Sequence, residues 1–295
     1  MRKKSLIFVM LIFSIVALFS GCSNKKQVSD GKINVMVSFN PLKDFTEAIG
    51  GEKVNVESLV PGTSEPHDFE PKTKDFAKLT EADIFIYSGL GLEDWIEDVK
   101  NNIGDSKVKL VEATEGINVL KTDGATDPHA WLSLVDAQKI CENIKNSLQD
   151  KDPKNKEYYE TRYKEYKNSL QKLYDDNTKR FKDLKNRDFI TSHEAFGYLC
   201  RDFNLQQRSL ENLFGEGENT PQKLAEIVTY AKANKINTIF MENSGSEKDA
   251  ETISRESGSK IQKIYTLETR EDNLNYLDAM KENLDRIYNS LSSIN

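Results

Sequence analysis

The chain has 295 residues, a formal net charge of −7 and only three histidines. Its 48 acidic residues outnumber its 41 basic ones, and no basic stripe stands out, which argues against a nucleic-acid partner. An acidic surface suits an exported protein that attracts cations.

The first residues are typical of a targeting segment. A basic start at residues 2–4 precedes an apolar run over residues 5–20, and Cys22 follows a small residue. This order predicts a lipoprotein signal over residues 1–21, with Cys22 as the lipidated first residue of the mature chain. An ordinary secretory signal with an incidental cysteine is the alternative. Residues 22–32 are polar, and we expect them to form a flexible tether.

Residues 33–150 alternate short β-rich runs with helical patterns. The runs read as strands are residues 33–39, 54–60, 82–89 and 107–113. Alternation of this kind is the rhythm of a parallel sheet with crossover helices. We therefore expect residues 33–150 to form an N-terminal α/β lobe.

A long helical pattern follows over residues 151–186. It contains no glycine, and its one proline, Pro153, stands at the first turn, where proline is tolerated. At about 1.5 Å per residue such a helix is roughly 50 Å long, which is more than one small domain needs. A coiled-coil segment is the alternative, but its apolar seam is broken near Asn177. The pattern predicts a linker helix between two lobes.

Residues 187–295 return to the alternating pattern. Strand-like runs cover residues 187–193, 205–213, 236–243 and 260–268, each followed by a polar or helical stretch. The predicted fold class is α/β, with two lobes, each a mostly parallel sheet flanked by helices, joined by one long helix. Cys141 and Cys200 are expected to pack in the core as free thiols rather than to form a disulfide.

The three histidines all lie at predicted element boundaries. His67 and His193 follow strands, and His129 precedes a helix. Ligands of open parallel sheets bind beyond the carboxyl ends of the strands, so two facing lobes can bring these side chains together. Imidazole suits zinc and other late transition metals. The spacings of 62 and 64 residues match no short metal motif, so a structural role for each histidine stays open.

A site of three neutral imidazoles needs an anionic fourth ligand, and Glu268 is the candidate because it ends the last predicted strand. Glu242 competes with it, since it also ends a strand. Glu194 and Asp68 are neighbours of histidines and are candidates to orient the rings. Trp131 is expected to wall the site.

Four stretches together carry a resemblance to a known family. They are "VPGTSEPHDFEPKTKDFAKLTEADIFIYSGLGLEDW", "DPHAWLSLVDA", "FITSHEAFGYL" and "INTIFMENSGSEKDAETISRESG". The chain resembles the zinc/manganese substrate-binding lipoproteins of ABC importers, the cluster A-I metal-binding lipoproteins, over residues 33–291.

The resemblance implies two lobes joined by a long helix, with a metal ion between them. It implies that His67, His129 and His193 are metal ligands and that Glu268 is the fourth. A histidine rather than a carboxylate at position 193 is similar to the zinc branch of the family. A histidine-rich loop between the first two ligands, common in that branch, is missing, since residues 68–128 contain no histidine.

The expected function is capture of zinc and its delivery to an ABC transporter permease. The expected protein is a monomer, not an enzyme, held by a lipid anchor on the extracytoplasmic face of the cell membrane. A manganese-binding protein or an adhesin of the same family is an alternative. A zinc hydrolase with Glu194 as its base is a more distant one, since a catalytic zinc keeps an open position for water.

Overall fold

The computed structural model describes residues 31–104, 106–215, 220–243 and 245–293. The predicted signal, Cys22 and most of the predicted tether lie outside the described residues. In the part of the chain that the structure describes, no helix combines the length and the apolar character that crossing a membrane requires.

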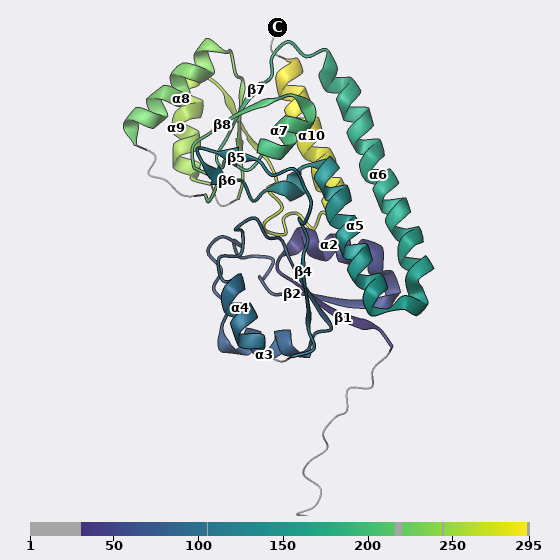
Figure 1. Cartoon of the computed structure of the whole chain (residues 1–295). Helices are drawn as coiled ribbons and strands as arrows, with labels where there is room; N and C mark the ends of the chain where they lie inside the picture. Colours follow the sequence, from purple (N-terminus) through teal and green to yellow (C-terminus); the bar gives the residue numbers. More distant parts are fainter. Residues whose placement is uncertain (1–30, 105, 216–219, 244, 294–295) are drawn as a thin grey trace, which may run out of the picture. The chain divides into compact units, whose positions relative to one another are not determined.

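Two four-stranded parallel sheets form the frame of residues 33–295 (Figure 1). The first has the order β2 (Val54–Ser58), β1 (Ile33–Val37), β3 (Ile84–Tyr87), β4 (Lys109–Glu112). The second has the order β8 (Gln206–Ser209), β7 (Asp188–Thr191), β9 (Thr238–Met241), β10 (Lys260–Lys263). The predicted fold class, two parallel sheets with a long helix between the lobes, is confirmed.

The second sheet repeats the strand order of the first. The amide of Ser38, directly after β1, donates across to the carbonyl of Ile86 at 2.9 Å. The amide of Ser192, directly after β7, donates to the carbonyl of Phe240 at 3.0 Å. The two lobes are therefore equivalent in strand order and at the carboxyl ends of these strands.

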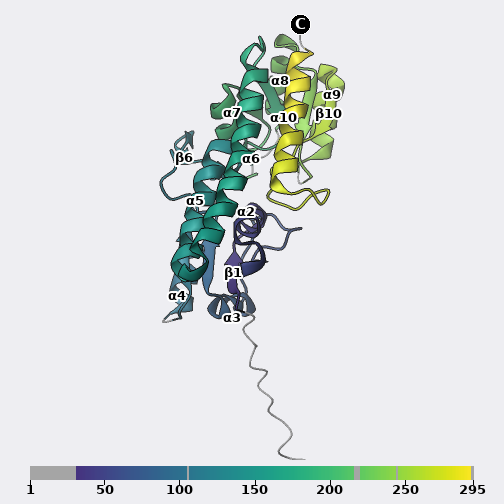
Figure 2. The ribbon, with the colours of Figure 1, turned by 90° about the vertical axis from the view of Figure 1, so that its right-hand side faces the viewer.

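Helices cover both sheets. In chain order they are α2 (Asn40–Gly50), α3 (Thr73–Glu81), α4 (Ile96–Ile103), α5 (Leu134–Lys151), α6 (Lys156–Lys182), α7 (Gly197–Phe203), α8 (Pro221–Ala233), α9 (Glu247–Ser257) and α10 (Tyr276–Ser292). A short hairpin of β5 (Lys121–Thr122) and β6 (Ala125–Thr126) leads from the first lobe into α5. Figure 2 shows the long helix α6 running along the molecule, beside α5 over one part of its length and beside α10 over another.

The predicted linker helix is shorter than expected at both ends. α5 ends at Lys151, a 3-10 turn follows over Pro153–Asn155, and α6 covers 27 residues, about 40 Å. Proline has no N–H to donate and fixes its own φ, so the chain turns there instead of continuing one helix. The Asp152 carboxylate accepts hydrogen bonds from the Asn155 amide and the Tyr159 hydroxyl, which stabilises the turn.

Tyr276, the first residue of α10, packs against the first lobe. The buried ring of Tyr276 lies 4.5 Å, centroid to centroid, from that of Phe45 in α2. Its hydroxyl donates to the carbonyl of Trp131 at 2.6 Å, and its amide donates to the Asp44 carboxylate at 2.8 Å. Since Tyr276 and Trp131 belong to one apolar core that runs through both lobes, the loop before α10 is held against the first lobe.

Both cysteines of this part of the chain are buried and free, as predicted. Cys141 is fully buried in α5, and Cys200 lies in α7 with 8% of its surface exposed. Burial raises the pKa of the Cys141 thiol well above its usual value. Both thiols therefore act as core side chains and not as metal ligands.

Candidate metal centre

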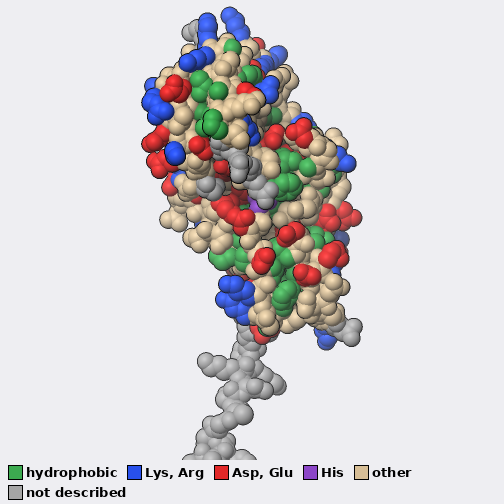
Figure 3. Space-filling model, turned by 90° about the vertical axis from the view of Figure 1, so that its left-hand side faces the viewer, with side chains coloured by type: hydrophobic (Ala, Val, Ile, Leu, Met, Phe, Trp, Pro, Cys, Tyr) green, Lys and Arg blue, Asp and Glu red, His purple; other side chains and the backbone are tan. Residues whose placement is uncertain are grey.

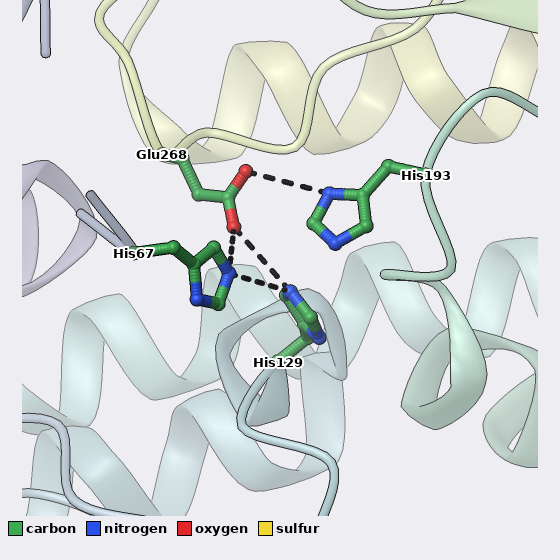
Figure 4. Close-up of side chains that lie close together, drawn as sticks. All are labelled: His67, His129, His193 and Glu268. Atoms are coloured by element: carbon green, nitrogen blue, oxygen red, sulfur yellow. Dashed lines mark hydrogen bonds and ion pairs between the residues drawn. The ribbon is translucent and has the colours of Figure 1, made fainter. Parts of the chain in front are cut away.

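Four side chains from four separate segments converge between the two sheets (Figure 4). His67 lies in the loop between β2 and α3, and His129 comes just before the 3-10 turn Ala130–Leu132. His193 stands two residues beyond β7. The predicted strand over residues 260–268 is wrong in length, because β10 ends at Lys263. Glu268 therefore belongs to the loop that Tyr276 fastens to the first lobe.

The facing atoms of the four side chains are spaced like the ligands of one ion. Glu268 Oε1 lies 3.0 Å from His67 Nε2 and 3.3 Å from His129 Nε2, and those two nitrogens are 3.3 Å apart. Glu268 Oε2 lies 3.8 Å from His193 Nδ1. Donor atoms about 2 Å from a common ion are roughly 3 to 3.5 Å from one another. All four sets of atoms lie within 4.8 Å of one another, so a small closure suffices to place one ion among them.

Asp127 orients the ring of His129. Its Oδ1 accepts the Nδ1–H of His129 at 2.8 Å and the backbone N–H of the same residue at 2.9 Å. This fixes the proton on Nδ1 and leaves the Nε2 lone pair facing His67 and Glu268. Sequence reasoning missed Asp127. The only signal was an aspartate two residues before a histidine, in "DPH".

His193 is oriented by a backbone group. Its Nε2–H donates to the carbonyl of Leu213 at 3.0 Å, so Nδ1 is the ring atom that faces Glu268. A carbonyl oxygen is present at every residue, so no sequence pattern could have found this partner.

Trp131 lies where it was predicted, beside the site. Its ring centroid is 5.1 Å from that of His129, and its Nε1–H donates to the Thr266 carbonyl at 2.8 Å.

The two carboxylates predicted to orient the rings do not do so. Asp68 is exposed, and Glu194 lines a cavity of about 160 Å³ near Leu213. Within the described residues neither forms a hydrogen bond with a histidine. Burial raises the pKa of Glu194. Adjacency in sequence failed as a guide because Asp68 lies in a turn with His67 and Glu194 in a bend with His193, and neighbouring side chains in turns and bends need not face the same point.

The site is buried, and its ionisable groups shift one another's pKa values. Burial lowers the pKa of His129, but hydrogen bonds to Asp127 and Glu268 outweigh it and the pKa is raised. Burial likewise opposes the charge on His193, while Glu242, Glu268 and the Leu213 carbonyl raise its pKa to about 10. Burial favours the neutral form of Glu268, yet the three histidines hold its pKa well below the usual value. Without metal, protons therefore take the place of the cation.

The four side chains are almost completely shielded from solvent. The side chains of His129 and Glu268 are 0% and 1% exposed, that of His193 is 3% exposed and that of His67 is 9% exposed. In Figure 3 a small patch of histidine surface is visible midway along the molecule, with acidic side chains beside it.

Residues 35–290 match the family described as zinc-uptake complex component A, periplasmic. The high-affinity zinc uptake system protein ZnuA of Bacillus subtilis is 35% identical over 316 residues, with 98% of each chain covered. The zinc-bound ZnuA-like domain of Streptococcus pneumoniae AdcA has a TM-score of 0.79 at 35% identity, covering 88% of this chain and 99% of that one.

A structure of the laminin-binding protein of Streptococcus agalactiae, described as bifunctional with adhesin and metal transporting activity, has a TM-score of 0.83 at 31% identity. It covers 88% of this chain and 99% of that chain. The fold and the site thus define a metal-binding component of an uptake system. The chain belongs to the zinc-uptake component A family, as its resemblance to the cluster A-I lipoproteins predicted.

Proposed function

We propose that this protein captures Zn²⁺ outside the cytoplasm and hands it to the permease of an ABC importer. The observation that carries the proposal is the convergence of His67, His129, His193 and Glu268, whose ligand atoms lie within 4.8 Å of one another. Three imidazole nitrogens and one carboxylate oxygen are a set that tetrahedral Zn²⁺ accepts with little strain. Mn²⁺ prefers more oxygen donors and lies lower in the general order of affinities.

The arrangement suits binding better than catalysis. Catalytic zinc sites keep one position open for water, whereas four protein donors complete a tetrahedral shell. Glu194, the base that a hydrolase needs, makes no hydrogen bond to any of the four residues in the described structure. Family membership also favours a transport component.

We further propose that Cys22 carries a lipid that holds the mature chain at the extracytoplasmic face of the membrane, as a monomer. In this arrangement residues 33–150 and 187–295 act as the two lobes and residues 151–186 connect them. The support is the order of basic, apolar and small residues before Cys22. Cys22→Ala is expected to remove the lipid. A wild-type chain without lipid on Cys22 contradicts the anchor.

The function is tested in a bacterial strain that lacks its own zinc-binding uptake component and grows poorly at low zinc. The wild-type chain, expressed with a matching permease, is expected to restore zinc accumulation. His129→Ala is expected not to, because His129 is the most deeply buried of the ligands. Asp68→Ala, an exposed change next to His67, is the matched control. Zinc accumulation that is equal in all three strains contradicts the proposal.

A further inference from the structure

A fifth carboxylate, that of Glu242, lies beside the four proposed ligands. Its Oε1 is 3.6 Å from His193 Nδ1, no farther than Glu268 Oε2, which is 3.8 Å from the same nitrogen. Only 3% of the side chain is exposed. It extends from the residue directly after β9, at the carboxyl end of the second sheet.

The rest of the protein does little to satisfy this buried charge. The Ser192 hydroxyl is 3.4 Å from Glu242 Oε1, a long hydrogen bond, and Glu242 Oε2 is buried with no hydrogen-bond partner among the described residues. His193 is its only ion-pair partner in that part of the chain. A buried carboxylate oxygen without a partner is costly, so its presence calls for a function.

The first lobe has a buried carboxylate at the equivalent end of its sheet, and both of its oxygens have hydrogen-bond partners. Ser88 follows β3 as Glu242 follows β9. There the buried carboxylate of Glu93 accepts the amide of Ser88 at 2.7 Å with one oxygen and the amide of Gly89 at 2.9 Å with the other. Glu93 thus has a hydrogen-bond partner on each oxygen and stabilises the backbone of the loop after β3. Glu242 is not used in this way, and helix α9 that follows it is capped by Ser246 instead.

The charge of Glu242 also acts on its surroundings. Burial together with Glu242 raises the pKa of Glu211 to about 7. Glu242 acts in the same direction on Glu271, where burial is the larger cause of a raised pKa. Three neutral imidazoles and Glu268 leave a bound divalent ion with one positive charge, and a second carboxylate cancels it. Buried charges are stable when they are compensated in this way.

We propose that Glu242 is an additional metal ligand for divalent ions that prefer five or six donors, most of them oxygen. Mn²⁺ is the ion used to test this, and Zn²⁺ does not need the extra ligand. The proposal rests on the proposed function of the same site. Glu242 is not among the four residues whose atoms lie within 4.8 Å of one another, so its side chain must move toward the ion. Its weak hydrogen bonding leaves little to oppose that movement. Zn²⁺ is complete with four donors, whereas Mn²⁺ prefers octahedral oxygen.

The test compares Zn²⁺ and Mn²⁺ affinities, by competition with a chelator at one pH, in the wild type and three variants of the full mature chain. Glu242→Gln removes the charge and the anionic donor. Glu242→Asp keeps the charge but shortens the reach by one methylene. Glu271→Gln is the control for charge alone, because Glu271 is a buried carboxylate that pairs with Lys263 and not with His193. Thermal melting without metal checks that each variant is folded.

Both Glu242 variants are expected to weaken Mn²⁺ binding about tenfold or more beyond any loss for Zn²⁺, while Glu271→Gln leaves the ratio of the two affinities unchanged. Equal losses of affinity for Zn²⁺ and Mn²⁺, or full Mn²⁺ affinity in Glu242→Asp, overturn the proposal. Either result means that Glu242 acts only through its charge and does not bind the ion. If Glu242→Gln does not fold, Glu242→Asp alone decides. A wild type that does not bind Zn²⁺ sinks the proposed function, whereas normal Zn²⁺ binding with an unchanged ratio sinks only this inference.

Discussion

Replacement of Asp127 by alanine is expected to weaken zinc binding although Asp127 does not face the ion. In the wild type one oxygen of Asp127 accepts two N–H groups of His129, from the ring and from the backbone. The alanine variant leaves both donors buried without that partner, and each costs about 1 to 3 kcal/mol unless water reaches it. It also frees the His129 ring to turn and to move its proton to Nε2, the atom that we propose as the metal ligand.

The expected loss is about 10- to 100-fold in zinc affinity, the usual effect of removing a hydrogen-bond partner of a metal-bound histidine. That loss corresponds to roughly 1.4 to 2.8 kcal/mol. Asp127→Asn keeps an oxygen that can accept the ring proton, so its effect should be the smaller of the two. Competition titration against a chromophoric chelator measures both variants.

Asp68→Ala is the matched control, because Asp68 also lies beside a proposed ligand in sequence but is exposed. It is expected to bind zinc like the wild type. A folded Asp127→Ala protein that binds zinc within about twofold of the wild type refutes the reasoning, since an orienting partner cannot be removed at so small a cost.

Three further predictions follow from the same geometry. The pKa values of His129 and His193 are raised in the metal-free protein, so zinc must displace their protons. Zinc affinity should therefore fall in acid and rise with pH until the pH reaches about 10, the pKa of His193. Calorimetry in buffers of different ionisation heat should show that zinc binding near pH 7 releases protons, at least the one held by His193, whose pKa is about 10; no proton release contradicts the raised pKa values. His193→Glu adds an oxygen donor and a charge, so chelator competition should show a narrower gap between Zn²⁺ and Mn²⁺ affinities; a wider gap argues against His193 as a ligand. Small-angle scattering should change little when zinc binds, because α6 contains no glycine or proline to bend it and the Tyr276 contacts hold the lobes together; a large compaction rules out that rigidity.

The positions of the histidines could be predicted because parallel strands end at the same edge of a sheet. His67 and His193 each follow a strand, so their convergence depends only on the strand order and on two lobes that face each other. Glu268 was chosen for the same reason, but it lies on a loop five residues beyond β10. Leu267, next to it, has a positive φ of 67°, a backbone conformation that the sequence pattern does not predict for leucine.

The partners that orient the proposed ligands could not be predicted. Asp127 is positioned by a hairpin whose strands have two residues each, too short for any alternation to be read. Its Oδ2 also packs closely against Gly197, so closely that a Cβ atom at that position would lie only 2.6 Å from it. This contact joins two segments that are far apart in the sequence. The start of the linker helix was placed too early, at residue 151 instead of Lys156, because Pro153 is equally compatible with the first turn of a helix and with a turn between two helices.

X-ray absorption at the zinc edge of the mature protein loaded with one equivalent of zinc tests the central claim most directly. The account predicts three imidazoles and one carboxylate, with nitrogen and oxygen at about 2.0 to 2.2 Å and no sulfur. Loss of one imidazole from the spectrum in His193→Ala ties the signal to this site. Fewer than three imidazoles in the wild type, or a sulfur ligand at about 2.3 Å, contradicts the assignment of His67, His129, His193 and Glu268 as the zinc ligands.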